Sequence, residues 1–149
     1  MPSGSPAYPD RVRTQRQVVD YALRRRALLA EVHSGRVGVA DVCDASPYLL
    51  RAARFHGEPS DQTCPVCRKE RLTQVSWIFG DALKHAAGSA RKPEEIEQLA
   101  NQHVDFSVYV VEVCRTCSWN HLVLSYVMGT GDVPDDSRRR SDRRRTAAE

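Results

Sequence analysis

The sequence predicts an α+β protein in which N-terminal helices are followed by a three-stranded antiparallel sheet with an inserted helix. Three observations predict this class. Apolar residues recur at helical spacing between residues 10 and 34. Residues 71–79 and 104–113 are rich in β-branched and aromatic side chains, which is typical of strands. Two Cys-x-x-Cys pairs are each followed by a strand-like run, and 149 residues suffice for one ordinary domain.

The first part of the chain divides into a leader and a helical region. Residues 1–10 are rich in Pro, Ser and Gly, which predicts a leader without regular structure. The helical region, residues 11–57, opens with a helix over about residues 10–34. A short helix follows from Val39. A third helix is expected at Ser46-Pro47, where a capping hydroxyl precedes a proline at the first helical position.

Residues 58–129 are predicted to form the sheet domain. It begins with a polar link over residues 58–62 and contains an inserted helix at 93–102, which starts with proline and acidic residues. The three strands are expected at residues 71–79, 104–113 and 119–128. Alternation places four apolar residues of the last strand on one side: Leu122, Leu124, Tyr126 and Met128.

The two cysteine pairs predict one structural zinc ion. The pairs are Cys64/Cys67 and Cys114/Cys117. A gap of two residues lets the chain turn tightly enough for two thiolates to grip one ion, and the second pair completes a tetrahedron. This is the arrangement of a zinc ribbon. Four thiolates leave no open position for water, so the ion would be structural and not catalytic, while an iron–sulfur cluster is the alternative.

Charge is segregated along the chain. Residues 11–36 carry a net charge of +5 and residues 137–149 one of +4, whereas residues 37–136 carry −5. The polar, Arg-rich tail at residues 130–149 has nothing to bury, which predicts disorder. The acidic middle argues against nucleic-acid binding by the sheet, because phosphate contacts need Lys and Arg.

Two groups of side chains are candidates for binding. Arg24, Arg25 and Arg26 are the candidate contacts to a nucleic acid or a protein partner, and a solvated helix face is the alternative. Aromatic residues of the sheet would stack on bases if they lined one exposed face, and would otherwise form the core. They are Trp77, Phe79, Tyr109, Trp119 and Tyr126.

Composition points to a cytoplasmic protein that is not an enzyme. The sequence has no apolar run of membrane-spanning length and no signal peptide, and cytosolic thiols stay reduced. It has no Gly-rich phosphate loop, no paired-carboxylate motif and no nucleophile arrangement that spacing reveals. The fifth cysteine, Cys43, is predicted to be a small buried residue, with a redox role beside the cluster as the alternative.

Four stretches carry a resemblance to a known family: Asp41–Ala45, Tyr48–Ala53, Cys64–Cys67 and Cys114–Asn120. Over about residues 15–129 the chain resembles an uncharacterised family of small actinobacterial zinc-ribbon proteins with four cysteines. The resemblance implies a cytoplasmic protein with a four-cysteine metal site and brings no established activity. Many zinc ribbons have glycine after the second cysteine of each pair. Arg68 and Ser118 stand there in this chain, which leaves the geometry of these loops open.

These observations favour a non-catalytic zinc-ribbon adaptor or regulator that docks on a nucleic-acid machine, either RNA polymerase or the ribosome. The saturated metal site and the basic ends around an acidic body motivate this hypothesis. Direct DNA or RNA binding through the Arg-rich N-terminal helices is a second hypothesis, and a thiol/zinc redox sensor is a third.

Overall fold

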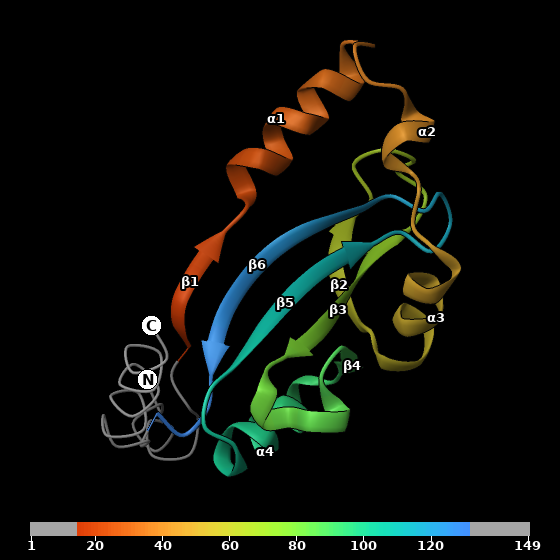
Figure 1. Ribbon diagram of the computed structural model, residues 1–149. Helices are drawn as coiled ribbons and strands as arrows, with labels where there is room; N and C mark the ends of the chain where they lie inside the picture. Colours follow the sequence, from red (N-terminus) through yellow and green to blue (C-terminus); the bar gives the residue numbers. More distant parts are fainter. Residues whose placement is uncertain (1–14, 132–149) are drawn as a thin grey trace, which may run out of the picture.

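The protein is an antiparallel sheet with helices at both ends, in a computed structural model that describes residues 15–131 (Figure 1). The predicted leader, residues 1–10, and residues 132–149 of the predicted tail lie outside the described residues. The elements follow in the order β1 (Arg16–Asp20), α1 (Ala22–His33), α2 (Val39–Val42), α3 (Pro47–His56), β2 (Glu58–Thr63), β3 (Arg71–Phe79), η2 (Asp81–Ala86), β4 (Ser89–Arg91), α4 (Pro93–Gln102), β5 (Phe106–Val113) and β6 (Asn120–Met128). None of the helices in the described part of the chain is long and apolar enough to cross a membrane.

The sheet is larger than the predicted three-stranded ribbon. It has six strands in the order β1-β6-β5-β3-β2, and β4 also pairs with β3. The three predicted strands form its centre, with β5 between β3 and β6 and all pairs antiparallel. The mixed helix and antiparallel sheet class is therefore confirmed, while the three-stranded zinc-ribbon layout is wrong because three further strands extend the sheet at its edges.

The first of these strands, β1, replaces the start of the predicted N-terminal helix. Val19 pairs with Ser125 of β6, and the helix begins only at Ala22. Val18 and Val19 are β-branched and fit a strand, and pairing with the free edge of β6 outweighs the helical spacing of the apolar residues. The Asp20 carboxylate accepts a hydrogen bond from the Ala22 N–H at 2.8 Å, which marks the change from strand to helix.

The other edge strands come from segments predicted to lack strands. Residues 58–63 form β2 and not a polar link, with Pro59 opposite Thr73 of β3. The short strand β4 lies in the connection after β3, where Ala90 pairs with Trp77. Both strands are polar or very short, as edge strands commonly are, so neither has the apolar alternation from which strands are recognised.

The remaining predicted helices are confirmed. The Ser46 hydroxyl accepts a hydrogen bond from the Leu49 N–H at 3.1 Å, Pro47 is the first residue of α3, and the helix ends before Gly57. The short helix from Val39 is α2, and α4 has the predicted bounds.

A register shift in β6 changes the faces of this strand. Val110 pairs with Leu124, but the next residue of β5, Val111, pairs with Leu122, so Val123 is an extra residue. Because directly opposed residues point to the same face, Leu122 lies on the opposite face from Leu124. The prediction that Leu122 shares a side with Leu124, Tyr126 and Met128 is wrong for this reason.

The two faces of the sheet carry different cores. One face, which we call the α4 face, packs Ile78, Val108 and Val110 against Ile96 and Ala100 of the helix. The other, the α3 face, packs its apolar residues against Ala52 and Ala53; these sheet residues are Val75, Val111 and Val113. A third cluster lies at the end of the sheet near α1 and α2, away from α4 (Figure 1), and contains cysteine side chains.

Candidate metal centre

The four cysteines of the two pairs come together at one end of the sheet. Their Sγ atoms all lie within 4.8 Å of one another, with Cys64 3.7 Å from Cys117 and Cys67 3.6 Å from Cys114. The first pair stands in the loop between β2 and β3 and the second in the loop between β5 and β6. Cys64 and Cys114 are buried. Four sulfur donors at these separations can hold one metal ion.

The two cysteine loops, residues 64–70 and 114–119, share a pattern of backbone hydrogen bonds. In each loop the residue after the second cysteine donates its N–H to the carbonyl of the first, Arg68 to Cys64 at 3.1 Å and Ser118 to Cys114 at 2.9 Å. The N–H of each first cysteine is bonded to the carbonyl at the end of its loop, on Glu70 and Trp119, at 2.7 and 2.8 Å. Each loop is thus a closed turn that aims two sulfurs at one point.

Backbone N–H groups also point at the four sulfurs. The N–H groups of Val66, Lys69, Cys117 and Trp119 lie 3.4–3.5 Å from the Sγ atoms of Cys64, Cys67, Cys114 and Cys117, in that order. Donors of this kind stabilise negative charge on sulfur. The loops are therefore built to hold thiolates, which is the form that binds metal.

The residues that replace the usual glycine keep its conformation. Arg68 has φ of +60° and Ser118 has φ of +74°, both in the left-handed region. That region costs a residue with a Cβ about 1–2 kcal/mol. Both loops therefore have the backbone conformation that glycine favours at this position. The hydrogen bonds of the loops hold Arg68 and Ser118 in it.

The thiols differ in their affinity for a proton. The N–H of Lys69 lowers the pKa of Cys67 to about 7, whereas burial raises the pKa of Cys114 and of Cys117 to about 12. Without an ion, Cys67 is therefore the first of these three to ionise. An ion bound by all four sulfurs must displace the protons of the others.

A buried carboxylate connects this centre to α1. Glu112 of β5 is only 3% exposed; its Oε2 accepts hydrogen bonds from Trp119 Nε1 at 2.7 Å and Arg25 Nε at 2.9 Å. Trp119 is fully buried beside the cysteines. Sequence reasoning missed Glu112, although a carboxylate on the same strand face as Val108 and Val110 is the signal that could have found it.

The comparisons with known proteins give a family and no activity. The family model described as "Family of unknown function (DUF5318)" matches residues 12–142. The chain belongs to the DUF5318 family. The Uncharacterized protein Rv0049 of Mycobacterium tuberculosis and the Uncharacterized protein Mb0050 of Mycobacterium bovis are each 67% identical to it over 111 residues, which is 74% of this chain and 81% of theirs. No solved structure is significantly similar to it. The expectation that the chain belongs to a family without established activity is thereby confirmed.

In this DUF5318 member the three candidate arginines have different surroundings. Arg25 is held by Glu112 in an ion pair of 2.9 Å. Arg24 lies over the ring of Tyr21, with its guanidinium carbon 5.6 Å from the ring centre. Arg26 lines a hollow on α1 together with Arg25 and His33. Arg24, Arg25 and Arg26 are therefore not equivalent as contacts for a partner, because the charge of Arg25 is already paired with Glu112.

Cys43 lies beside the four-cysteine cluster. Its Sγ is 3.5 Å from Cys117 Sγ, and the side chain is half-buried at the end of α2. Burial raises the pKa of the Cys43 thiol. Cys43 was predicted to be a small buried residue and is only half-buried. Its position beside the cluster is the one that the alternative redox role requires, and that role stays a prediction.

Proposed function

We propose that the chain is a non-catalytic protein, stabilised by one structural zinc ion, that docks on RNA polymerase or the ribosome. The observation that carries the metal part is the set of sulfur separations at the cysteine cluster. A tetrahedron with Zn–S bonds of ~2.3 Å has edges of about 3.8 Å, close to the Cys64–Cys117 and Cys67–Cys114 sulfur separations of 3.7 and 3.6 Å. Four thiolates fill the coordination of zinc, so no position is left for a reacting water.

The proposed ion would connect the end of the sheet to α1 and to the segment after α2. It would join the two cysteine loops, and both loops contact the helices beside them. His33 Nε2 of α1 lies 3.4 Å from the carbonyl of Pro65, and the Ala45 N–H after α2 donates to the carbonyl of Ser118 at 3.0 Å. Structural zinc contributes roughly 10–16 kcal/mol in small domains, which exceeds the stability of many of them.

An iron–sulfur cluster is the rival occupant, and elemental analysis separates the two. Protein purified without oxygen is expected to contain zinc and to lack the visible absorption of an iron–sulfur cluster. Iron and acid-labile sulfide in stoichiometric amounts would contradict the zinc assignment.

Docking on a nucleic-acid machine is supported by the charge on the N-terminal part of the chain. Residues 11–36 carry +5, and two arginines of α1, Arg24 and Arg26, are exposed. Two experiments on a mycobacterial lysate test the proposal: co-sedimentation of the chain with ribosomes, and affinity capture of RNA polymerase. Enrichment of the chain with one machine supports it, and absence from both would refute it.

A redox sensor is the second candidate, and one contact favours it: the Cys43 and Cys117 sulfurs are 3.5 Å apart. Hydrogen peroxide would take two electrons from the Cys43 thiol and the Cys117 thiolate, form an S–S bond between the two sulfurs and leave, with one proton taken from solvent, as two waters. The metal would then lose the Cys117 thiolate as a ligand.

The redox candidate is tested by metal release under mild peroxide. Wild-type protein is expected to release its zinc with formation of a Cys43–Cys117 disulfide seen in peptide mapping. The Cys43→Ser variant is expected to keep its zinc for longer. Equal release from both proteins, or zinc retained by the wild type, would rule this candidate out.

A further inference from the structure

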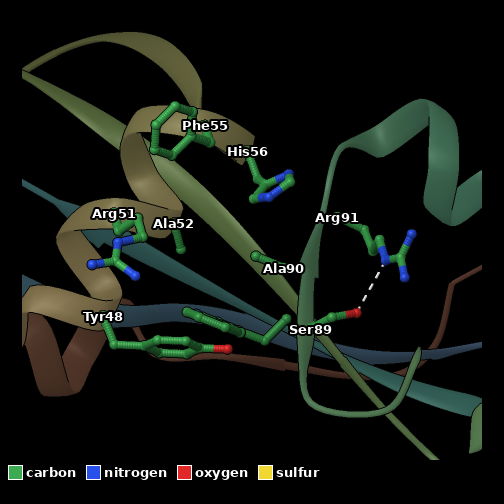
Figure 2. Close-up of a pocket in the computed structure, with 9 residues that line it drawn as sticks. Tyr48, Arg51, Ala52, Phe55, His56, Ser89, Ala90 and Arg91 are labelled. Atoms are coloured by element: carbon green, nitrogen blue, oxygen red, sulfur yellow. Dashed lines mark hydrogen bonds between the residues drawn. The ribbon is translucent and has the colours of Figure 1, made fainter. Parts of the chain in front are cut away.

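A groove on the α3 face is separate from the metal centre. One hollow of about 370 Å³ lies between α3 and β4, with Tyr48, Phe55 and Trp77 among its lining residues (Figure 2). A second hollow of about 300 Å³ is lined by Arg54 and Arg115 among others. Arg51 and Phe55 line both hollows, so the two hollows adjoin at these side chains on the exposed side of α3, and together we call them the α3 groove.

The α3 groove is positively charged although the body of the protein is acidic. Neither hollow is lined by an Asp or Glu of the described chain. Arg51, Arg54 and Arg115 have no carboxylate within ion-pair distance among residues 15–131, unlike Arg91 at the groove edge, which pairs with Glu95 at 3.2 Å. The acidic net charge of the middle of the chain therefore does not describe this surface.

Aromatic rings lie beside the arginines. Tyr48 is stacked on Trp77 with ring centres 5.5 Å apart and planes at 25°. Phe55 is 57% exposed on the next turn but one of the same helix, and the guanidinium carbon of Arg54 lies 5.2 Å from its ring centre. On the same sheet face, Trp77 is opposite Tyr109, whose ring meets that of Phe79 at 5.6 Å. Exposed rings beside arginines that have no carboxylate partner in the described chain form a surface that neither a packed core nor a solvated helix requires.

We propose that the α3 groove binds single-stranded nucleic acid. Phosphates would contact Arg51, Arg54 and Arg115, and bases would stack on the exposed rings of Tyr48 and Phe55. Single strands are bound by positive grooves with aromatic side chains, because every base has a stacking face that a duplex keeps inside. The site goes beyond the proposed docking function, and it differs from the Arg24–Arg26 helix considered from sequence.

The metal centre would support this groove. Arg115 stands between the two cysteines of the second cysteine loop, so the ion would fix the residue that faces α3. Asn120 Nδ2 at the end of that loop also donates to Asp44 Oδ1 at 2.9 Å, just before α3 begins. These contacts place α3 and the loop at a defined separation.

Fluorescence anisotropy of the zinc-loaded full chain with a labelled RNA strand tests the proposal. A strand of about 12 nucleotides lies within the known site sizes of ~4–16. DNA of the same sequence and the matching duplex are the comparison probes. Each titration is repeated between about 50 and 200 mM salt, because the salt slope counts phosphate contacts.

Two pairs of variants separate the groove from the rest of the chain. Arg51→Ala/Arg54→Ala removes two charges from the groove, and Arg24→Ala/Arg26→Ala removes two from α1. Phe55→Leu removes a ring but keeps an apolar side chain, and Phe55→Tyr restores the ring. The Arg-rich residues 138–145 are present in every protein, so they cancel in each comparison. Circular dichroism and zinc content confirm that each variant is folded.

The proposal predicts that the single strands bind more tightly than the duplex. Arg51→Ala/Arg54→Ala should reduce the salt slope by about 1.4, at ~0.7 for each phosphate contact in a single strand, while Arg24→Ala/Arg26→Ala leaves it unchanged. Phe55→Leu should weaken binding about 5- to 150-fold, the cost of one stacked base, and Phe55→Tyr should restore it. Similar affinities for RNA and DNA would show that the groove reads phosphates and bases without the 2′-hydroxyl.

Three results would overturn it. Equal slopes for the wild type and Arg51→Ala/Arg54→Ala, with a loss only in Arg24→Ala/Arg26→Ala, would move the site to α1. Duplex binding as tight as single-strand binding would exclude stacking on Phe55. Displacement of the strand by polyglutamate of equal charge as effectively as by unlabelled RNA would identify the groove as a surface for acidic peptides.

Discussion

At the scale of single residues, the buried Glu112 carboxylate is the feature that sequence reasoning missed and the structure makes central. It accepts hydrogen bonds from the sheet end, through Trp119, and from α1, through Arg25. A carboxylate taken out of water needs such partners, because burial of a charge without them costs several kcal/mol. A sequence shows a single Glu in a strand but not the two donors, which stand 7 and 87 residues away.

We predict that Glu112→Gln lowers the free energy of unfolding by about 1–3 kcal/mol, because it weakens two hydrogen bonds to a buried group. Urea unfolding of the zinc-loaded protein measures the change. The matched control is Arg36→Gln, whose contact with Glu31 is 3.8 Å long and exposed, with an expected cost below about 0.5 kcal/mol. Equal costs for the two variants would contradict the role given to Glu112.

A residue with positive φ in a cysteine loop gives a prediction of increased stability. Ser118→Gly is expected to raise the free energy of unfolding by about 1 kcal/mol, because glycine adopts φ of +74° without the Cβ clash. Thermal unfolding of the zinc-loaded protein measures it. Arg115→Gly in the same loop is the control and should destabilise, since no positive φ is found there. A lower stability of Ser118→Gly would show that the serine side chain itself is needed.

At the scale of elements, the sequence predicted those with strong local signals. The helix α3 has a capping serine and an N-terminal proline, and β3 has nine residues rich in β-branched and aromatic side chains, so α3 begins and β3 begins and ends where the sequence predicted. The strands β1 and β2 were missed because their state is decided by pairing with a distant strand. The extra residue Val123 in β6 was missed because a register shift depends on the partner strand.

The N-terminal cap of α3 is a prediction at this scale. Ser46→Ala should lower the free energy of unfolding by about 1 kcal/mol, since the Leu49 N–H loses its acceptor. Chemical unfolding measures the loss, and Ser46→Asp should recover most of it because its carboxylate accepts the same bond. The α3 groove is formed in part by α3. If Ser46→Ala lowers the free energy of single-strand binding by more than it lowers the free energy of unfolding, the first turn of α3 frays in the variant.

At the scale of the whole molecule, the cysteine cluster is where sequence and structure agree best. The spacing of the two pairs predicted that four thiols from distant loops would meet, and the structure brings their sulfurs within 4.8 Å. Spacing succeeds here because each pair is a local turn whose chemistry requires a partner pair. The contact of Cys43 with Cys117 and the α3 groove depend on how α2 and α3 pack, which no local pattern encodes.

The central claim is that one zinc ion, bound by these four cysteines, holds the fold together. Native mass spectrometry of the full chain, with circular dichroism of the same samples, tests it most directly. We predict one zinc per wild-type chain, loss of both zinc and regular structure in Cys64→Ser, and retention of both in Cys43→Ser, whose thiol lies outside the set of four. A folded wild-type chain without metal, or a Cys64→Ser variant that keeps its zinc and its structure, would contradict the claim.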